Sequence, residues 1–481
     1  MVKYNTKKSS SFSSEKTENL AGGEAFKVPK EFEILSFMAT SFMKDTFYST
    51  ENKDVERLKE MFNDCKDKEF FAKSAVYVRN EFGMRSVTHL AAVLVAKNVK
   101  KEKWTKHFYN AVFRRVDDIT ETVALYLSWY KKPLPNSLKK GIRIALNKFD
   151  DYQIAKYKAE GNSVKLVDVL NLTHPFPTKD NIKSFKKLIE GTLKNTETWE
   201  ALLSEAGKEE DKVEAKQEVW EKLISEKKLG YFALLRNLNN INKQAPKMLD
   251  KALKQLLDKE AIKGSLVLPF RFLTAYKKLQ GEDGTNKILS ALDTAAEISL
   301  DNVPNLKGKT CIFLDQSGSM QGQPLEKASL FAAVICKKLN ADIFGFGTRA
   351  DFIAYNNKDS ILTLSEKFSS ADQGGTDFKA PFEKIIDSNL KYDRIIILSD
   401  MQGWIGYDSP DEVYQKYCKL IKQKPYIYSW DLQGHGTTQL PYEKVMCLAG
   451  WSEKVFDLMK FLETDREKML STVKSVSFIN Q

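Results

Sequence analysis

The chain has 481 residues, which is too long for one ordinary hydrophobic core and predicts two or three domains. Its composition, with 42% hydrophobic and 29% charged residues, excludes a wholly disordered chain, a collagen and a membrane bundle. The longest mostly apolar stretch, residues 90–96, is far shorter than the roughly 20 residues that a membrane-spanning helix needs. The chain has no signal-peptide pattern, and its five cysteines are widely spaced without a CxxC pair. We therefore expect a cytoplasmic protein without disulfides, a zinc site or a membrane partner.

The net charge of +11 is unevenly distributed along the sequence. Residues 301–481 contain 22 basic and 23 acidic residues, so the first 300 residues carry 53 basic against 41 acidic ones. A positive excess confined to one part predicts a polyanionic partner for that part, and nucleic acid is the usual one. A lysine-rich surface that is merely well solvated is the open alternative.

Residues 1–28 are rich in Ser, Lys, Gly and Glu and are expected to form a flexible N-terminal arm. Residues 29–304 follow a helical pattern almost throughout, as where Val55, Leu58 and Phe62 share one face. Pro and Gly are sparse and lie between the periodic segments. This pattern predicts stacked helical pairs in a solenoid, open or closed into a ring, although no strict sequence repeat is visible.

From residue 305 to 481 short apolar runs alternate with helical segments. This alternation predicts a doubly wound α/β domain with a mostly parallel sheet. The predicted strands are 310–314, 342–346, 352–355, 394–398 and 426–430, and the predicted helices are 325–339, 411–422 and a segment around 453–462.

Oxygen-bearing side chains follow the first predicted strand of this domain. Asp315, Ser317 and Ser319 alternate on a turn that contains Gly318, at the carboxyl end of a strand, where α/β sheets bind ligands. A loop with Thr376 and a second strand ending before Asp400 can complete a set of hard oxygen ligands. Such a set suits Mg²⁺ or Mn²⁺ and not zinc.

Three other interpretations of this segment are open. A phosphotransfer nucleophile would need a second carboxylate where Ser317 stands, and a nucleophile elbow would need Gly in place of Gln316. A Ser/Gly turn that only caps the next helix is the third. The full pattern resembles the metal-ion-dependent adhesion site of von Willebrand factor A domains, whose five positions correspond here to Asp315, Ser317, Ser319, Thr376 and Asp400. The resemblance implies a binding device in which an acidic group of a partner completes the metal coordination.

Basic residues of the helical part share helix faces at i, i+4 spacing, as Arg85 does with His89 and Lys139 with Arg143. Further basic residues cluster nearby in the sequence, as a phosphate-tracking surface would require. Solvated lysines on amphipathic helices remain the alternative for any single position.

Several segments look like signatures of TROVE domains. They are residues 17–24, 83–89, 152–157, 172–175, 233–238 and 269–272. Together with the A-type domain they make the chain similar to the Ro autoantigen family. The resemblance implies a ring of HEAT-like helical repeats closed by the A-type domain. It also implies a non-enzymatic ribonucleoprotein component acting in RNA quality control, with small structured Y-like RNA on an outer basic surface and single-stranded 3′ ends of misfolded non-coding RNA in the central hole.

The RNA-surface residues that this resemblance implies are Arg85, His89, Lys139, Lys140, Arg143, Lys156, Lys158 and His174. Phe176 stands where relatives often have a basic residue, which weakens the expected phosphate contact of that loop. An exoribonuclease, or another protein with an acidic residue, is the partner expected at the metal site. Two alternatives stay open: an adhesion-type protein-interaction module with incidental basic helices, and a metal-dependent hydrolase, for which no nucleophile–base set is visible.

Overall fold

The computed structural model describes most of the chain, and its residues form two compact units. The α/β unit comprises Met1–Ser41, Thr46–Tyr48 and Leu256–Arg466, and the helical unit comprises Phe42–Asp45, Ser49–Gln255 and Glu467–Gln481. The structure describes residues 16–479 apart from 20–21, 23, 28–29, 41–50, 158–162, 194–197, 371–373, 404–409, 432–436, 439, 441–444, 450–458, 460–462 and 464–466.

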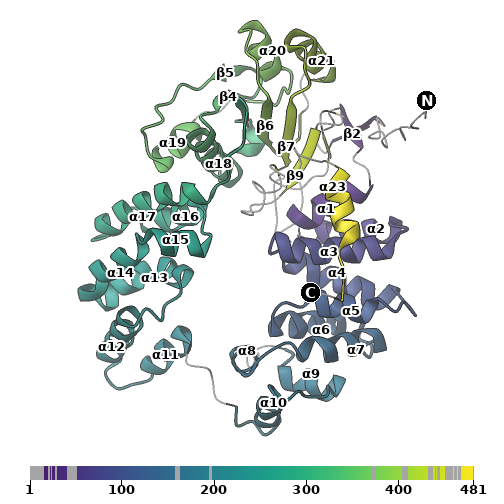
Figure 1. The fold of residues 1–481 in the computed structure, drawn as a ribbon, viewed down its shortest axis with the longest axis vertical. Coiled ribbons are helices and arrows are strands. Elements are labelled where there is room, and N and C mark those ends of the chain that lie inside the picture. Colours follow the sequence, from purple (N-terminus) through teal and green to yellow (C-terminus); the bar gives the residue numbers. More distant parts are fainter. Residues whose placement is uncertain are drawn as a thin grey trace, which may run out of the picture. The chain divides into compact units, whose positions relative to one another are not determined.

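The helical unit consists of consecutive helices that pack on near neighbours in the sequence (Figure 1). For example, α3 packs on α4, and α7 packs on both α5 and α9. This arrangement confirms the predicted helical-repeat fold. Its helices are α2 (Glu51–Asp64), α3 (Lys68–Glu81), α4 (Ser86–Asn98), α5 (Thr105–Val112), α6 (Val116–Tyr130), α7 (Asn136–Leu146), α8 (Asp151–Lys156), α9 (Leu166–Thr173), α10 (Ile182–Ile189), α11 (Trp199–Ala206), α12 (Lys212–Ser225), α13 (Tyr231–Gln244), α14 (Leu249–Leu256) and α23 (Glu467–Ser475).

Local sequence explains how these helices begin and how closely they pack. Asp67 precedes α3, and its carboxylate accepts a hydrogen bond from Phe70 N at 2.9 Å. Gly141 lies in the middle of α7, where a Cβ atom would stand 2.5 Å from the Cβ of Tyr109 on α5. Glycine therefore allows α5 and α7 to approach more closely than any other residue would.

The α/β unit is built on a six-stranded sheet in the order β5-β4-β3-β6-β7-β9. All neighbouring strands are parallel except β5, which pairs antiparallel with β4. The predicted mostly parallel sheet is thus confirmed, with β9 as a strand that the sequence pattern did not indicate. The strands are β3 (Thr310–Asp315), β4 (Asp342–Phe346), β5 (Ala350–Phe352), β6 (Arg394–Ser399), β7 (Tyr426–Asp431) and β9 (Val445–Ala449).

Helices cover both faces of this sheet. The helices of the unit are α1 (Lys30–Thr40), α15 (Lys259–Ser265), α16 (Pro269–Leu279), α17 (Asn286–Ser299), α18 (Gln323–Leu339), α19 (Ile361–Phe368), α20 (Ala380–Asp387) and α21 (Pro410–Ile421). On one face, Phe331 of α18 lies edge-on to Trp430 of β7, with ring centroids 4.4 Å apart.

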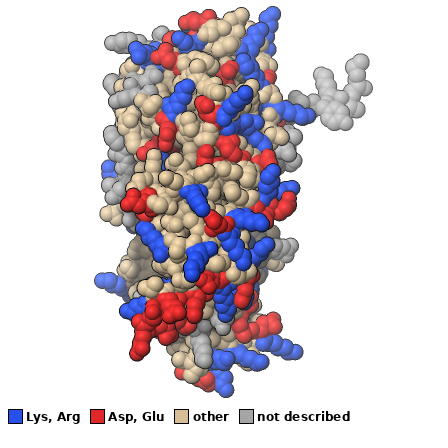
Figure 2. Space-filling view, turned by 90° about the vertical axis from the view of Figure 1, so that its left-hand side faces the viewer, with Lys and Arg blue, Asp and Glu red and all other residues tan. Residues whose placement is uncertain are grey.

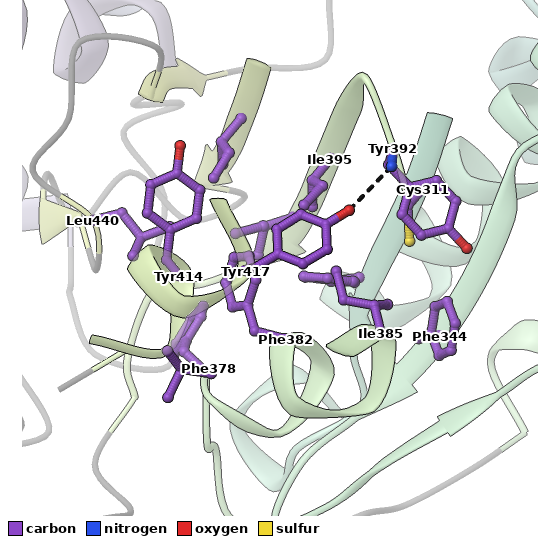
Figure 3. Packing of buried hydrophobic residues seen from close by; sticks show 14 of the residues in the cluster. Cys311, Phe344, Phe378, Phe382, Ile385, Tyr392, Ile395, Tyr414, Tyr417 and Leu440 are labelled. Atoms are coloured by element: carbon purple, nitrogen blue, oxygen red, sulfur yellow. Dashed lines mark hydrogen bonds between the residues drawn. The ribbon is translucent and has the colours of Figure 1, made fainter. Parts of the chain in front are cut away.

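Figure 3 shows the core on the other face, where aromatic side chains of α20 and α21 meet the strands. Phe382 of α20 contacts Phe313 of β3 edge-on at 5.1 Å between ring centroids. Tyr417 of α21 is fully buried, and its hydroxyl accepts a hydrogen bond from Tyr392 N at 3.0 Å, just before β6. Burial of these rings helps to hold β3 and β6 beside each other. The loops that carry the candidate metal ligands follow the carboxyl ends of these two strands.

The N-terminal segment differs from the expected flexible arm. Strand β1 (Lys16–Glu18) pairs antiparallel with β2 (Glu24–Lys27), and β2 pairs with β8 (Thr437–Thr438). The buried side chain of Asn19 also donates a hydrogen bond to the carbonyl oxygen of Gly403 at 2.6 Å. Residues 1–15 of the expected arm lie outside the described residues.

The limits of the compact units also differ from the predicted domain limits. The change from helices to strands does fall near residue 304, between the short 3-10 helix Leu300–Asn302 and strand β3. However, α17 belongs to the α/β unit, where Glu297 forms a 2.9 Å ion pair with Lys337 of α18 and accepts a hydrogen bond from Ile361 N. The predicted helix around 453–462 lies largely outside the described residues.

None of the described helices is long and apolar enough to cross a membrane.

Candidate metal centre and nucleic-acid interface

The two predicted metal-binding aspartates lie at the same edge of the sheet. Strands β3 and β6 are parallel neighbours in which Leu314 pairs with Leu398, so Asp315 lies opposite Ser399 and Asp400 follows at the next position of the same strand end. Both carboxylates are fully buried. The structure thus brings together two residues that are 85 positions apart in the sequence.

Hydrogen bonds link the two hydroxyl-bearing loops to each other and to Asp315. Ser317 N donates to Asp315 Oδ1 at 2.9 Å, and the hydroxyl oxygens of Ser317 and Ser319 lie 3.4 Å apart. Gly318 N donates to the carbonyl oxygen of Gly374 at 2.8 Å, which anchors the loop that carries the buried Thr376. All three predicted loops therefore converge at one end of the sheet.

Ser399 is a polar residue of this cluster that the sequence analysis did not select. Its hydroxyl donates to Asp315 Oδ2 at 2.5 Å and accepts a hydrogen bond from Met401 N at 2.9 Å. Ser399 ends β6 immediately before Asp400. In the sequence, only its position next to the candidate ligand Asp400 could have pointed to Ser399. The contact of its hydroxyl with Asp315 becomes visible only through the pairing of β6 with β3.

The electrostatics of the cluster favour a bound cation. Burial, together with the negative charge of Asp400, raises the pKa of Asp315 to about 7. Two buried carboxylates surrounded by hydroxyl groups form a hard-oxygen donor set, which fits Mg²⁺ or Mn²⁺. Among the described residues, no group of three or more His, Cys, Asp or Glu side chains could hold a metal ion, so a site here depends on the serine and threonine hydroxyls.

Two of the predicted RNA-surface residues, Arg85 and His89, belong to an ion-pair network around Asp118. Asp118 is fully buried and lies 2.9 Å from Arg79 Nη2, 2.9 Å from Arg85 Nη2 and 3.0 Å from His89 Nε2. His89 is itself buried, and its Nδ1 lies 3.2 Å from Glu121 Oε2. These contacts give both residues a role in packing α3, α4 and α6 together.

The network shifts the pKa values of His89 and Asp118 so that the charged form of each side chain is favoured. Burial lowers the pKa of His89, but hydrogen bonds to Asp118 and Glu121 outweigh it, and the pKa is raised. Burial likewise opposes ionisation of Asp118, yet His89 and Arg79 hold its pKa far below the usual range. At neutral pH Asp118 is therefore a buried anion that its basic neighbours compensate.

The basic residues of α7 and the end of α9 form a second group, which we call the α7–α9 basic surface: Lys139, Lys140, Arg143 and His174. Arg143 Nε donates to the carbonyl oxygen of Thr173, the residue before His174. His174 ends α9 in the left-handed conformation, with φ of 47°, and its side chain is exposed. Lys140 is also exposed, whereas Lys139 and Arg143 are half-buried.

The two remaining candidates follow α7 in the sequence. Lys156 is exposed on α8, where its ammonium lies 5.7 Å from the ring centroid of Tyr152. Lys158 lies outside the described residues. Figure 2 shows one face of the molecule, on which Lys and Arg are interspersed with Asp and Glu and acidic side chains gather in the lower part. The positive excess of the chain is therefore not concentrated on that face.

Comparison with known proteins places these features in a family. The sequence model of the TROVE domain matches residues 34–192 and 191–289, which is more than half of the chain. The chain belongs to the TROVE domain family. The predicted relationship to Ro proteins, based on the motifs and the two-part architecture, is thereby confirmed.

Individual members and neighbours agree with this assignment. The chain is 27% identical over 219 residues to "RNA-binding protein RO60" of Caenorhabditis elegans, an alignment that covers 41% of this chain and 34% of that protein. It is 26% identical over 200 residues to a von Willebrand factor A domain-containing protein of Dictyostelium discoideum, covering 37% of this chain and 23% of the relative. The chain thus spans about a third or less of the length of these curated relatives.

The crystal structure of the Ro (RSR) protein of Deinococcus radiodurans has the same fold as this TROVE protein. The two superimpose with a TM-score of 0.61 over 84% of this chain and 93% of that chain, at 18% sequence identity. This likeness extends over both the helical repeats and the α/β sheet.

Proposed function

We propose that this TROVE protein binds RNA without catalysing a reaction on it, through the helical unit. The observation that carries the proposal is the contact between Arg143 and Thr173, which joins the predicted basic residues of α7 to His174 at the end of α9. This contact brings two basic segments 30 residues apart in the sequence next to each other, which supports the proposal of one surface. Phosphate groups of a structured RNA are the ligands that such a surface suits.

The class of RNA is proposed from the resemblance to the Ro family. The name of the C. elegans relative describes an RNA-binding protein. We assign a small structured, Y-like RNA to the α7–α9 basic surface and single-stranded 3′ ends of misfolded non-coding RNA to a central hole of the ring that the resemblance implies. In this proposal the protein acts in cytoplasmic RNA quality control as part of a ribonucleoprotein.

The metal site is proposed to serve partner binding. Asp315, Ser317, Ser319, Thr376 and Asp400 would hold one Mg²⁺ or Mn²⁺, some directly and some through water. The ion would supply a positive centre that an acidic side chain of an exoribonuclease, or of another protein, can approach. The buried, adjacent aspartates support this role, because a cation relieves the unfavourable burial of two like charges.

The test is RNA affinity measured on charge-reversal variants of the full chain. Lys140→Glu should weaken binding of a stem-loop RNA with a single-stranded 3′ tail, and the effect should diminish as salt increases. Lys416→Glu, an exposed lysine of α21 in the α/β unit, is the matched control. Equal affinity of both variants and the wild type would reject the α7–α9 basic surface.

The same measurement separates the alternative function. In an adhesion-type module the metal site captures a protein partner, and the basic helices are incidental. The convergence of Asp315 and Asp400 favours this alternative only if RNA fails to bind at all. A tailed RNA that outcompetes a blunt duplex of equal charge would support the RNA proposal, since only a single strand can enter a narrow hole.

A further inference from the structure

A pocket outside the α7–α9 basic surface is lined by aromatic and basic side chains of the helical unit. It has a volume of about 460 Å³ and lies among residues of α8, α11, α12 and α13. This volume falls in the range of roughly 300–1,000 Å³ that is typical of small-ligand sites. The six side chains that characterise it are Tyr152, Lys156, Trp199, Lys222, Lys228 and Phe232.

The aromatic members of the pocket offer unusually accessible rings. Tyr152 is 51% exposed and Phe232 is 43% exposed, although aromatic side chains of this size normally bury most of their area. Trp199 is half-buried, and one face of its ring lies against Trp220 at 6.5 Å between centroids. Trp220 is fully buried, and its indole N–H donates to Gln244 Oε1 at 2.9 Å. The Trp199 ring is therefore held in place before any ligand arrives.

The charge of the pocket is positive. Three lysines line it against one glutamate, Glu200. Lys156 and Lys222 are exposed, and the ammonium of Lys156 lies 5.7 Å from the ring centroid of Tyr152. Lys228 forms a 2.6 Å ion pair with Glu226 at the exposed rim. Positive charges beside exposed rings attract a ligand that carries both anionic groups and flat aromatic groups.

We infer that this pocket is a base-stacking site for single-stranded RNA, where bases stack on Tyr152 and Phe232 and the lysines contact the phosphates. The inference rests on the proposed function and adds a second RNA contact to it. Stacking on aromatic side chains tolerates any base, because every base has a π-face. The pocket therefore selects single strands over duplexes, whose bases are already stacked on each other.

An acidic peptide is the main other ligand that three lysines could attract. It would gain nothing from the exposed rings beyond burial. The presence of several accessible aromatic faces in one pocket favours nucleotides. An RNA strand of the same length but without bases separates the two possibilities, because it keeps the phosphates and removes the stacking partners.

The experiment uses the full chain and three ligands: a ten-nucleotide oligouridine, an abasic strand of equal length, and a stem-loop RNA without a single-stranded tail. The Tyr152→Ala/Phe232→Ala double variant should bind oligouridine at least about thirtyfold more weakly than the wild type, the scale of two lost stacking contacts. Its affinity for the stem-loop should not change. The wild type should prefer oligouridine to the abasic strand, and the double variant should show little preference.

Two further variants keep the result interpretable. Tyr152→Phe preserves the ring and should keep the wild-type affinity for oligouridine, whereas Phe352→Ala removes an exposed ring of β5 in the α/β unit and should have no effect. Unchanged oligouridine binding by the double variant, with stem-loop binding intact, would overturn this inference alone. Failure of the wild type to bind any of the RNAs would instead overturn the proposed function. Equal loss of oligouridine and abasic strand in the double variant would show that the rings do not stack on bases.

Discussion

The guanidinium of Arg143 donates a hydrogen bond to the carbonyl oxygen of Thr173, and this contact ties the middle of the α7–α9 basic surface to the loop that carries His174. Arg143 is half-buried, so part of its function is structural. Lys140, one turn away and exposed, has no such constraint from burial. The two residues therefore allow the structural and electrostatic contributions to be measured separately.

The first prediction concerns this pair. Lys140→Ala should weaken RNA binding and reduce the slope of log affinity against log salt by about 1, without changing stability. Arg143→Ala should weaken RNA binding as well and also lower the free energy of unfolding by about 1 kcal/mol, because a hydrogen bond is lost. Affinity titrations at several salt concentrations and urea unfolding check both statements. Identical stability of the two variants would contradict the structural role of Arg143.

The second prediction concerns the network around Asp118. Asp118→Asn removes the buried anion and leaves Arg79 and His89 without their common partner, so unfolding should become easier by about 3–5 kcal/mol. Glu121→Gln changes a side chain that is 44% exposed and should cost less than about 1 kcal/mol. Urea unfolding of both variants gives the comparison. A stable Asp118→Asn protein that had lost RNA binding would instead place Arg85 and His89 on the RNA surface.

The third prediction is the pH dependence that His89 produces. Its pKa in the folded protein is raised above the ordinary value, so the folded state binds the proton more tightly than the unfolded state does. The resulting stabilisation is fully present below about pH 6.5, the unfolded pKa, and is lost as the pH rises through the folded pKa. The free energy of unfolding of the wild type minus that of His89→Gln should therefore decrease over this interval. A difference that increased with pH would contradict the ion-pair assignment.

The fourth prediction concerns the metal site. Mg²⁺ or Mn²⁺ should raise the melting temperature of the wild type at pH 8, because the ion offsets the repulsion between two buried carboxylates. Asp315→Asn should abolish this shift while leaving the metal-free fold intact, since it removes one of the two charges. RNA affinity should be unchanged, and no metal-dependent RNA cleavage should appear in the wild type.

Asp387→Asn, an exposed residue at the end of α20, is the control for the metal experiment and should respond to Mg²⁺ as the wild type does. Ser399→Ala should weaken the response, because it removes the hydroxyl that orients Asp315. An Asp315→Asn protein that still gained stability from Mg²⁺ would place the cation elsewhere. One that lost RNA binding while folded would make the metal site part of the RNA surface.

The convergence of the candidate metal ligands at one end of the sheet was predictable from the sequence, because neighbouring parallel strands end at the same side of a sheet. Asp315 and Asp400 each follow a buried apolar run, and that position alone implied that they could meet. Ser399 could not be selected in the same way. Its contact with Asp315 depends on the register between β6 and β3, which residue spacing does not encode.

The contacts of the basic residues are not encoded in their spacing. The i, i+4 spacing of Arg85 and His89 predicts a shared helix face, but it does not say what that face contacts. Asp118 lies 29 positions beyond His89 and turns this face into an internal ion-pair network. Strand β2 illustrates the same point, because it pairs not only with the nearby β1 but also with Thr437–Thr438, far along the chain.

The close approach of α5 and α7 has a consequence for genetics. Any side chain at Gly141 would collide with Tyr109 near its backbone, so α7 could accommodate it only by moving outward. Lys139, Lys140 and Arg143 are fixed to that helix and would move with it. A random screen for mutants defective in RNA binding should therefore recover changes at Gly141 together with changes at the lysines, although a glycine in the interior of the unit touches no RNA.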